Sequence, residues 1–284
     1  MRLFSDRLGV LATMHQKERV MAPILERELG IKLSVLPNFN TDAFGTFTRE
    51  IKRIGNQLEA ARLKAEKALA LTGETLGFAS EGTFGPHPVL PYIACNRELV
   101  ILLDQANDLE LVGQSFSTET NYRQKEVETL QEAYDFALEV GFPEHGLVVM
   151  VNASSQDSGH IFKGITTPEQ LTEAFNLALR ESPNGKVHVE TDMRALYNPT
   201  RMKNIAQATR DLIIKIQQIC PTCAWPGFDI VEQKRGLPCE LCHLPTELIL
   251  SAIYQCKKCN FSQEVLFPNG KEKADPAQCM YCNP

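Results

Sequence analysis

The chain has 284 residues, of which 43% are hydrophobic and 23% are charged, and its formal net charge is −6. This length and apolar content suffice for one large buried core, alone or with a small satellite domain. The negative balance gives the chain no electrostatic footprint for nucleic acid or for an anionic membrane. We therefore expect neither of these as a partner.

The first 14 residues carry scattered charges and contain no apolar run of signal-peptide length. The longest apolar stretches, such as residues 99–103, have the length of a strand and are too short to cross a bilayer. We therefore expect a cytoplasmic protein without membrane spans. In that compartment paired cysteines are metal ligands rather than disulfides.

The first 219 residues alternate between strand and helix patterns, which favours an α/β domain with a mixed sheet flanked by helices. The first half is predicted to contain strands and helices in alternation, at residues 9–13, 17–29, 32–36 and 56–71. The helix over 56–71 has the clearest pattern, because Leu58, Ala61 and Ala65 recur at helical spacing. Between the second strand and this helix, residues 37–49 form a polar loop.

The second half of this domain is predicted to continue the sheet and to add three helices. Strands are expected at residues 75–80, 98–104, 108–115, 146–151 and 186–190. Helices are expected at residues 125–140, 168–180 and 199–218. A rigid loop over 82–88 separates the first two of these strands. It contains His87 between two prolines, where the ring is presented to solvent or to a cleft.

Eight of the nine cysteines lie after residue 219, which marks a domain boundary between residues 1–219 and 220–284. They form four Cys-x-x-Cys pairs: Cys220/Cys223, Cys239/Cys242, Cys256/Cys259 and Cys279/Cys282. Two intervening residues let one tight turn place both sulfurs on the same ion, and two such turns complete a tetrahedral zinc shell. The sequence therefore predicts a small zinc-ribbon-type domain with two structural Zn²⁺ ions.

Two alternatives to this zinc assignment are an iron–sulfur cluster and a redox Cys-x-x-Cys motif, but a redox motif needs one pair beside a βαβ pattern. We expect sequential pairing, in which the first two pairs share one ion and the last two share the other. Spacing also allows an interleaved arrangement. Cys95, outside this series, is expected to be a buried core thiol.

The cysteine-rich tail contains six basic and seven acidic residues, a net charge of −1. Phosphate contacts supply most of the affinity for nucleic acid, and this tail has no excess positive charge to provide them. A closed shell of four thiolates also leaves no coordination position for catalysis. We expect the tail to be a small domain held together by zinc, which either stabilises the protein or binds a protein partner.

Three polar groups in the α/β domain are candidates for chemistry. Lys17 lies at a strand-to-helix junction, where the carboxyl end of a strand and a helix N-terminus attract phosphate. Glu59, on the helix over 56–71, and Glu81, just after a strand, are suited to hold Mg²⁺ against a substrate phosphate. The alternative is that each is a solvated surface charge.

The third group follows the strand at 186–190 and contains Asp192, Arg194 and Arg201. Guanidinium groups bind phosphate or carboxylate in bidentate fashion, so Arg194 and Arg201 are candidate substrate contacts. A carboxylate beside them, Asp192, is a candidate for orienting a water molecule. The alternative is a structural network around a capped helix.

Residues 9–115 resemble the inosine/xanthosine triphosphate pyrophosphatase-like fold, including its Maf-type branch. The resemblance rests on residues 9–13 with Lys17, on the pattern L-E-A-A-R-L-K-A over 58–65, and on A-S-E-G-T over 79–83. It implies that Glu59 and Glu81 are Mg²⁺ ligands and that Lys17 contacts a triphosphate. The whole chain also resembles an uncharacterised bacterial family, frequent in cyanobacteria, whose function is unknown.

Our leading hypothesis is a Mg²⁺-dependent phosphohydrolase or pyrophosphatase that acts on a nucleotide-like substrate. In this hypothesis Glu59, Glu81 and Asp192 are catalytic, and Lys17, Arg194 and Arg201 bind the phosphates. The competing hypothesis is a non-enzymatic adaptor, in which the α/β domain presents the zinc module to another protein. The enzyme hypothesis requires Glu59, Glu81 and Lys17 to converge on one cleft within metal-bridging reach, and it fails if they do not.

Overall fold

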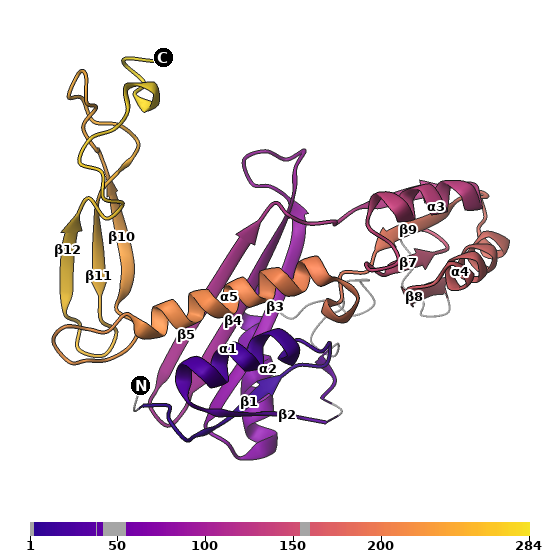
Figure 1. The fold of residues 1–284 in the computed structure, drawn as a ribbon, viewed down its shortest axis with the longest axis horizontal. Helices are drawn as coiled ribbons and strands as arrows, with labels where there is room; N and C mark the ends of the chain where they lie inside the picture. Colours follow the sequence, from indigo (N-terminus) through magenta and orange to yellow (C-terminus); the bar gives the residue numbers. More distant parts are fainter. Residues whose placement is uncertain (1–2, 38, 42–54, 154–159) are drawn as a thin grey trace. The chain divides into compact units, whose positions relative to one another are not determined.

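A computed structural model describes residues 3–37, 39–41, 55–153 and 160–284 of the chain. Most of the polar loop predicted over 37–49 lies outside the described residues. The contacts divide the chain into two compact units, Met1–Ile213 and Ile214–Pro284 (Figure 1).

The first unit contains a five-stranded sheet in the order β2-β1-β3-β4-β5 (Figure 1). Its strands are β1 (Leu8–Ala12), β2 (Lys32–Val35), β3 (Leu76–Pro86), β4 (Ala94–Asp104) and β5 (Leu109–Ser117). The strand β1 pairs with β2 and β3 in parallel, whereas β3, β4 and β5 form an antiparallel meander. The sheet is therefore mixed, and the carboxyl ends of its three parallel strands lie at one edge.

Helices pack on both faces of this sheet. On one face, α2 (Gln57–Thr72) buries an alanine stripe that includes Ala61, Ala65 and Ala68 against Ala79 and Ile101. Small side chains allow the helix to approach the strands closely. The helix begins at a capping box and ends at a left-handed glycine, which together satisfy the free backbone groups at both ends.

The opposite face carries α5 (Pro199–Gln217), whose last residues belong to the second unit. Gly113 of β5 pairs with Val100, which alternates with Ile101 and so points away from α2. A Cβ atom at Gly113 would collide with backbone atoms of Ala208 and Leu212. This glycine therefore permits the close approach of α5 to the sheet. The helix α1 (Glu18–Leu29) links β1 to β2 and ends at a left-handed Gly30.

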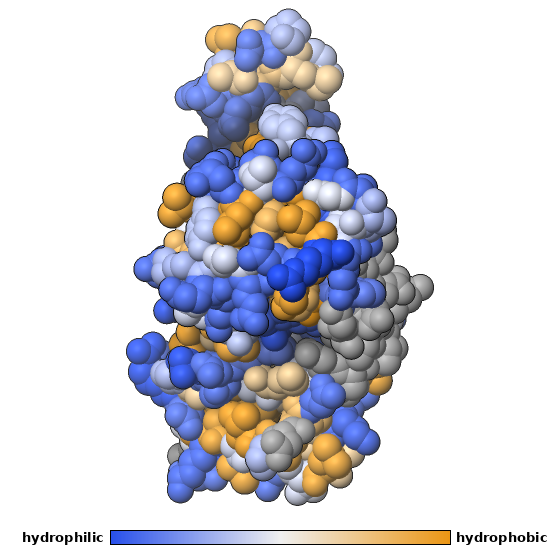
Figure 2. All heavy atoms as spheres, turned by 90° about the vertical axis from the view of Figure 1, so that its right-hand side faces the viewer, coloured by the Kyte–Doolittle hydropathy of each residue, from blue (hydrophilic) through white to orange (hydrophobic). Residues whose placement is uncertain are grey.

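A second sheet of the first unit has the order β6-β9-β7-β8. Its strands are β6 (Gln124–Val127), β7 (Leu147–Met150), β8 (Ile161–Ile165) and β9 (Val187–Thr191). Two helices, α3 (Leu130–Glu139) and α4 (Pro168–Glu181), cover one face and bury a core with Val149 and Val189 (Figure 1). In the view of Figure 2, hydrophilic residues cover most of the surface and apolar residues form separate patches.

The structure corrects three expectations about individual elements. Residues 82–86 are not a loop but the end of β3, because Pro86 occupies the last ladder position, opposite Ala94. The helix predicted over 125–140 begins only at Leu130, because Thr129 caps it and the preceding residues pair with β9. The strand β8 was not predicted.

The second unit consists of a three-stranded antiparallel sheet in the order β10-β11-β12. Its strands are β10 (Asp229–Arg235), β11 (Ile249–Gln255) and β12 (Ser262–Leu266). Most of its side chains are exposed or half-buried, so the sheet has almost no apolar core of its own. Across the described ranges of both units, no helix has the length and apolar character needed to span a membrane.

Candidate functional site

The eight cysteines of the tail gather in two groups of four. The first cluster contains Cys220, Cys223, Cys256 and Cys259, and the second cluster contains Cys239, Cys242, Cys279 and Cys282. Within each cluster all four sulfur atoms lie within 4.8 Å of one another. The two groups, with the mixed α/β sheet and the small antiparallel sheet, confirm the fold class expected from the sequence.

The spacing of the sulfur atoms fits zinc. Four Zn–S bonds of about 2.3 Å in a tetrahedron place the sulfurs about 3.8 Å apart. The Sγ atoms of Cys220 and Cys259 are 3.7 Å apart, and those of Cys242 and Cys279 are 3.6 Å apart. The donor set, four thiols with no carboxylate, suits the same ion. Both clusters are consistent with one structural Zn²⁺ each.

The pairing is interleaved, and the sequential pairing that we expected is wrong. We call each Cys-x-x-Cys pair, numbered in chain order, a knuckle. The first knuckle precedes β10 and the third follows β11. The ladder places Asp229 opposite Gln255, so both knuckles lie at the same end of the sheet. The second and fourth knuckles lie at the other end, beyond Arg235 and Leu266. Because a seven-residue strand spans about 23 Å, knuckles that are adjacent in the sequence cannot share an ion.

The backbone of the Cys220/Cys223 turn favours the thiolate form of Cys220. Ala224 adopts a left-handed conformation with φ 55°, and its N–H donates to the carbonyl of Cys220. Burial opposes ionisation of Cys220, but N–H groups of Cys223 and Thr222 outweigh it and lower the pKa of this thiol to about 7. Ready ionisation favours metal binding, because the thiolate is the ligand.

In the first unit, charged side chains meet where β3 passes the end of its parallel partner. Alternate residues of β3 point to opposite faces of the sheet. On one face, Lys17 donates from Nζ to Ser80 Oγ at 3.0 Å and to the carbonyl of Ser80 at 3.3 Å. On the other, Lys64 of α2 forms an ion pair of 2.6 Å with Glu81. All three charged groups are buried.

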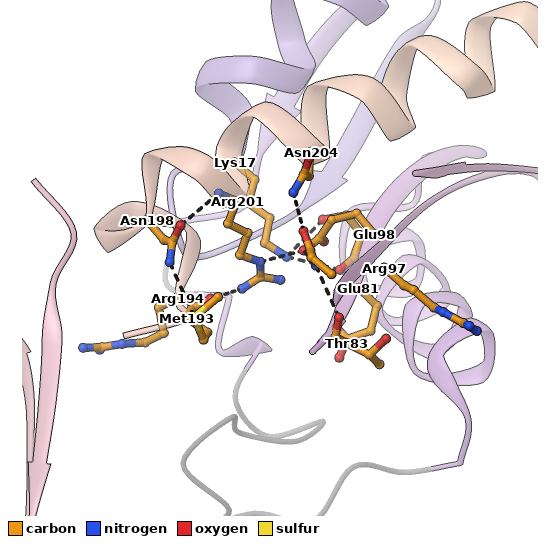
Figure 3. A network of polar contacts seen from close by, with 12 residues as sticks. Lys17, Glu81, Thr83, Arg97, Glu98, Met193, Arg194, Asn198, Arg201 and Asn204 are labelled. Atoms are coloured by element: carbon orange, nitrogen blue, oxygen red, sulfur yellow. Dashed lines mark hydrogen bonds and ion pairs between the residues drawn. The ribbon is translucent and has the colours of Figure 1, made fainter. Parts of the chain in front are cut away.

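Arg201 of α5 extends this group on the face of Lys17 (Figure 3). Its Nε donates to Glu98 Oε1 at 2.9 Å, and its Nη1 donates to the carbonyl of Met193. Both side chains press against the backbone of Gly82, where a Cβ atom would lie within 2.6 Å of Arg201 Nη2. We call the set Lys17, Lys64, Ser80, Glu81, Glu98 and Arg201 the buried polar cluster.

The buried polar cluster has more cations than anions. Burial, and then the charges of Arg201 and Lys64, lower the pKa of Lys17 to about 7, although Glu81 and Glu98 oppose this shift. Two carboxylates therefore face Lys64, Arg201 and Lys17, and Lys17 is readily deprotonated. An anion that entered this region would favour the protonated form of Lys17.

A pocket of about 500 Å³ lies at the carboxyl ends of β1 and β2, next to the cluster. Thr13, which follows β1, and Phe39 and Asn40, which follow β2, are among its lining residues. The hydroxyl of Thr13 is buried and has no hydrogen-bond partner in the part of the chain that the structure describes. In open α/β sheets this edge is where ligands bind.

The structure brings Lys17, Glu81 and Arg201 together but gives Glu59 a different contact. Glu59 is exposed, and its Oε2 accepts from the backbone N–H of Asn56 at 2.8 Å in the capping box of α2. Beyond the two tetra-cysteine clusters, no three metal-ligating side chains converge among the described residues. Among the residues described, protein side chains alone therefore do not form a Mg²⁺ cage, and the convergence of Glu59 with Glu81 and Lys17 that the enzyme hypothesis required is not observed.

Asp192 and Arg194 pair with each other. Arg194 Nη2 lies 2.6 Å from Asp192 Oδ2, which also accepts from the backbone N–H of Gly164. The guanidinium of Arg194 stacks on Tyr197 and points away from Lys17 and Glu81 (Figure 3). These contacts hold the turn after β9 in place.

The other two candidates also have local contacts. His87 Nδ1 accepts from the N–H groups of Val89 and Leu90, which fixes the hairpin between β3 and β4. Cys95 is buried, and its thiol donates to the carbonyl of Pro86. Neither side chain belongs to the buried polar cluster.

Lys64 and Glu98 belong to the cluster, although neither was predicted from the sequence as a site residue. A signal for Lys64 was present, because it lies in register with the buried alanines of α2 at positions 60, 61 and 68. A lysine on the buried face of a helix needs a buried partner. Glu98 opens the apolar run of β4 and gave no comparable signal.

These features define a zinc-binding protein of two units, an α/β unit with a buried polar cluster and a small sheet with a tetra-cysteine cluster at each end. The chain belongs to the family described as domain of unknown function (DUF6671), whose model matches residues 64–284. No curated protein matches the chain significantly. The matched region includes all eight tail cysteines and every member of the buried polar cluster except Lys17.

Proposed function

We propose that the first unit binds a phosphate-containing, nucleotide-like small molecule at the buried polar cluster and hydrolyses it with the help of Mg²⁺. The observation that carries this proposal is the convergence of Lys17, Lys64 and Arg201 on one edge of the sheet, beside a pocket. The resemblance of residues 9–115 to the inosine/xanthosine triphosphate pyrophosphatase-like fold supports the same chemistry.

Electrostatics supports an anionic substrate. A phosphate group near Lys17 compensates the repulsion by Arg201 and Lys64 that lowers its pKa. Binding then takes up a proton at Lys17 Nζ, so affinity falls as the pH rises above about 7. Thr13, in the wall of the adjacent pocket, offers a buried hydroxyl to the same ligand.

The two carboxylates of the buried polar cluster have different roles, metal binding and the orientation of a water molecule. When bound, Mg²⁺ polarises a phosphoryl oxygen, and it commonly uses one or two protein carboxylates together with the substrate's own phosphates. Glu81 is the better-placed protein ligand, because Glu59 is engaged in the cap of α2. Glu98 keeps Oε2 buried without a hydrogen-bond partner in the described ranges, and it is suited to orient a water molecule.

The test is a screen of nucleoside triphosphates with zinc-replete protein, measuring Mg²⁺-dependent release of phosphate or pyrophosphate. In Lys64→Met we expect the turnover to fall at least about 100-fold, because a buried charge at the reacting phosphate is lost. Lys67→Met removes an exposed lysine from the same helix and keeps full activity. Absence of turnover on every substrate, or equal turnover in the two variants, overturns the proposal.

A second candidate function is that of an adaptor, and the surface of the second cluster favours it. Leu241, Met280 and Tyr281 project from its knuckles and are 68%, 62% and 59% exposed. Exposed apolar side chains gathered at one end of a small sheet are typical of a protein contact. A protein partner should bind the wild type and the control variant Val231→Ser. It should not bind the variant Leu241→Ser/Met280→Ser. Identical retention by all three proteins contradicts the adaptor.

A further inference from the structure

A second pocket of the first unit, of about 490 Å³, lies between α1, the end of β5 and α5. Its walls include Ser115 and Ser117 of β5 and Lys203 and Arg210 of α5. It shares no residue with the buried polar cluster. The proposed phosphohydrolase therefore gives this pocket no role.

The edge of β5 supplies a backbone donor to the pocket. β5 is the last strand of its sheet, and the N–H of Gln114 donates to Asp211 Oδ2 at 2.8 Å instead of to β4. In an antiparallel ladder, N–H groups alternate between the two sides of a strand. The ladder is regular from Asp104 to Asn96, so the N–H of Phe116 also points to the open edge. Phe116 lines the pocket.

The side chains of α5 add positive charge at the same place. Lys203, Gln207 and Arg210 recur at positions i, i+4 and i+7, so they lie along one face of the helix. Neither Lys203 nor Arg210 forms an ion pair with another described residue. Glu119 is the single acid among the residues that line this pocket. The wall therefore has a positive balance.

Asn204 of α5 lines the pocket, and its hydrogen bonds hold the helix in place. Asn204 is more than nine-tenths buried, and its Nδ2 donates to Asn96 Oδ1 at 2.8 Å and to the carbonyl of Glu119 at 3.3 Å. Asn96 in turn donates to Glu98 Oε1 at 3.0 Å. These hydrogen bonds hold α5 against β4 and against the segment that follows β5, so the pocket is preformed rather than assembled by a ligand.

We infer that this pocket is a binding site for an oxyanion, the phosphate or carboxylate group of a small metabolite. The edge N–H of Phe116, two serine hydroxyls and the cations Lys203 and Arg210 are all donors, and charge-assisted bonds to oxyanions are the strong ones. The adjacent edge position already binds such a group, because Asp211 occupies the N–H of Gln114.

The backbone amide of Phe116 allows a direct test by NMR titration of the ¹⁵N-labelled full chain. Inorganic phosphate, succinate and chloride are added at matched ionic strength. We expect the Phe116 amide to shift and saturate with phosphate or succinate but not with chloride, and the stronger of the two identifies the class of oxyanion. The amide of Gln114, already bound to Asp211, serves as an internal control.

Variants separate this site from nonspecific binding. Lys203→Gln/Arg210→Gln is expected to bind the oxyanion at least about tenfold more weakly, because the loss of even one charged hydrogen bond has an effect of this size. The charge-matched control Lys67→Gln/Lys125→Gln keeps the wild-type affinity. Equal affinities in the two variants, or a Phe116 amide that responds no more to phosphate and succinate than to chloride, overturn the inference.

The test is independent of the proposed hydrolase. Lys64→Met disables the buried polar cluster but leaves the lining of this pocket intact. We therefore expect its Phe116 amide to titrate as in the wild type, even if no nucleotide is hydrolysed. Loss of the Phe116 response in Lys64→Met would show that phosphate acts through the cluster and contradict a separate site.

Discussion

The two units of this chain are stabilised in opposite ways. The first unit encloses apolar clusters under both of its sheets and places a few charged side chains within that interior. In the second unit, the most deeply buried residues include one cysteine from each knuckle: Cys220, Cys239, Cys256 and Cys279. Small domains bury too little apolar surface to be stable alone, and metal ligation replaces the missing core.

The same contrast separates what each unit can do chemically. In each tetra-cysteine cluster of the second unit, four thiols suffice to complete the shell of a zinc ion, which leaves no position for a substrate. The buried charges of the first unit lower its stability, because each loses its hydration. Charges retained in an interior at such a cost are more typical of a functional site than of a purely structural one.

Removal of zinc is the change with the largest expected effect. A chelator should unfold the second unit, because metal binding supplies on the order of 10 kcal/mol of folding free energy in such sites. The first unit should persist, since its cores contain none of the zinc-binding cysteines. Hydrogen exchange with and without chelator measures this, and equal loss of protection in both units would contradict the comparison.

Pairs of cysteine substitutions test which cysteines of the second unit share a zinc ion. Cys223→Ser/Cys256→Ser removes two ligands from one cluster, so we expect one zinc ion per chain to remain. Cys223→Ser/Cys242→Ser damages both clusters, so both ions should be lost. Sequential pairing predicts the reverse, and metal analysis of the purified variants distinguishes the two. Cys95→Ser, away from both clusters, is the control.

Packing, rather than metal, should control the stability of the first unit. Gly113→Ala places a methyl group against the backbone of α5, which cannot move aside as a side chain can. We expect a loss of about 3 kcal/mol in the free energy of unfolding. Gly85→Ala, where no atom lies within 4 Å of the new methyl group, should change it by less than about 0.5 kcal/mol.

Both variants should retain two zinc ions, and unfolding in urea followed by far-ultraviolet circular dichroism measures the difference. A common loss of stability in Gly113→Ala and Gly85→Ala would show that the close approach of α5 to β5 is not the cause. Loss of zinc from Gly113→Ala would contradict the independence of the two units.

The sequence predicted most elements of the fold because their signals were local. Gly30 and Gly73 end helices at left-handed residues, and the helix predicted over 56–71 corresponds to α2, with Asn56 as its cap. The pairing of the cysteines was not predictable from spacing, because it depends on which strand ends the ladder brings together. Likewise β6 carries charged residues with a helical pattern, and only its pairing with β9 makes it a strand.

The buried polar cluster was predictable in part. Lys17 follows the carboxyl end of β1, a position that sequence patterns locate, and Glu81 lies within β3, just past the end of β1. Their partners come from elsewhere in the chain: Lys64 from α2, Glu98 from β4 and Arg201 from α5. Glu59 looked equivalent to Glu81, but a glutamate at the third position of a helix also completes a capping box, and that contact is the one formed.

Removal of the Lys17 charge should have the smallest effect on stability, and this effect measures what burial of that charge costs in free energy. The pKa of Lys17 is about 7 in the folded chain and 10.5 when unperturbed, so the unfolded chain binds more protons between these values. Stability from this group therefore rises with pH across that interval, and the full cost of burial applies below pH 7. Lys17→Met removes the charge, so the variant should be more stable than the wild type at pH 6.

The gain should be on the order of 2 kcal/mol at pH 6 and should shrink toward pH 10. This gain in the free energy of unfolding is reduced by the same amount at every pH, because the variant has lost the hydrogen bonds from Lys17 to Ser80. Urea unfolding at pH 6, 8 and 10 measures the trend, with Lys67→Met as an exposed control that shows none. A difference that does not vary with pH would mean that Lys17 is buried with its charge fully compensated. The cluster would then be structural, and the contrast between the two units would rest on zinc alone.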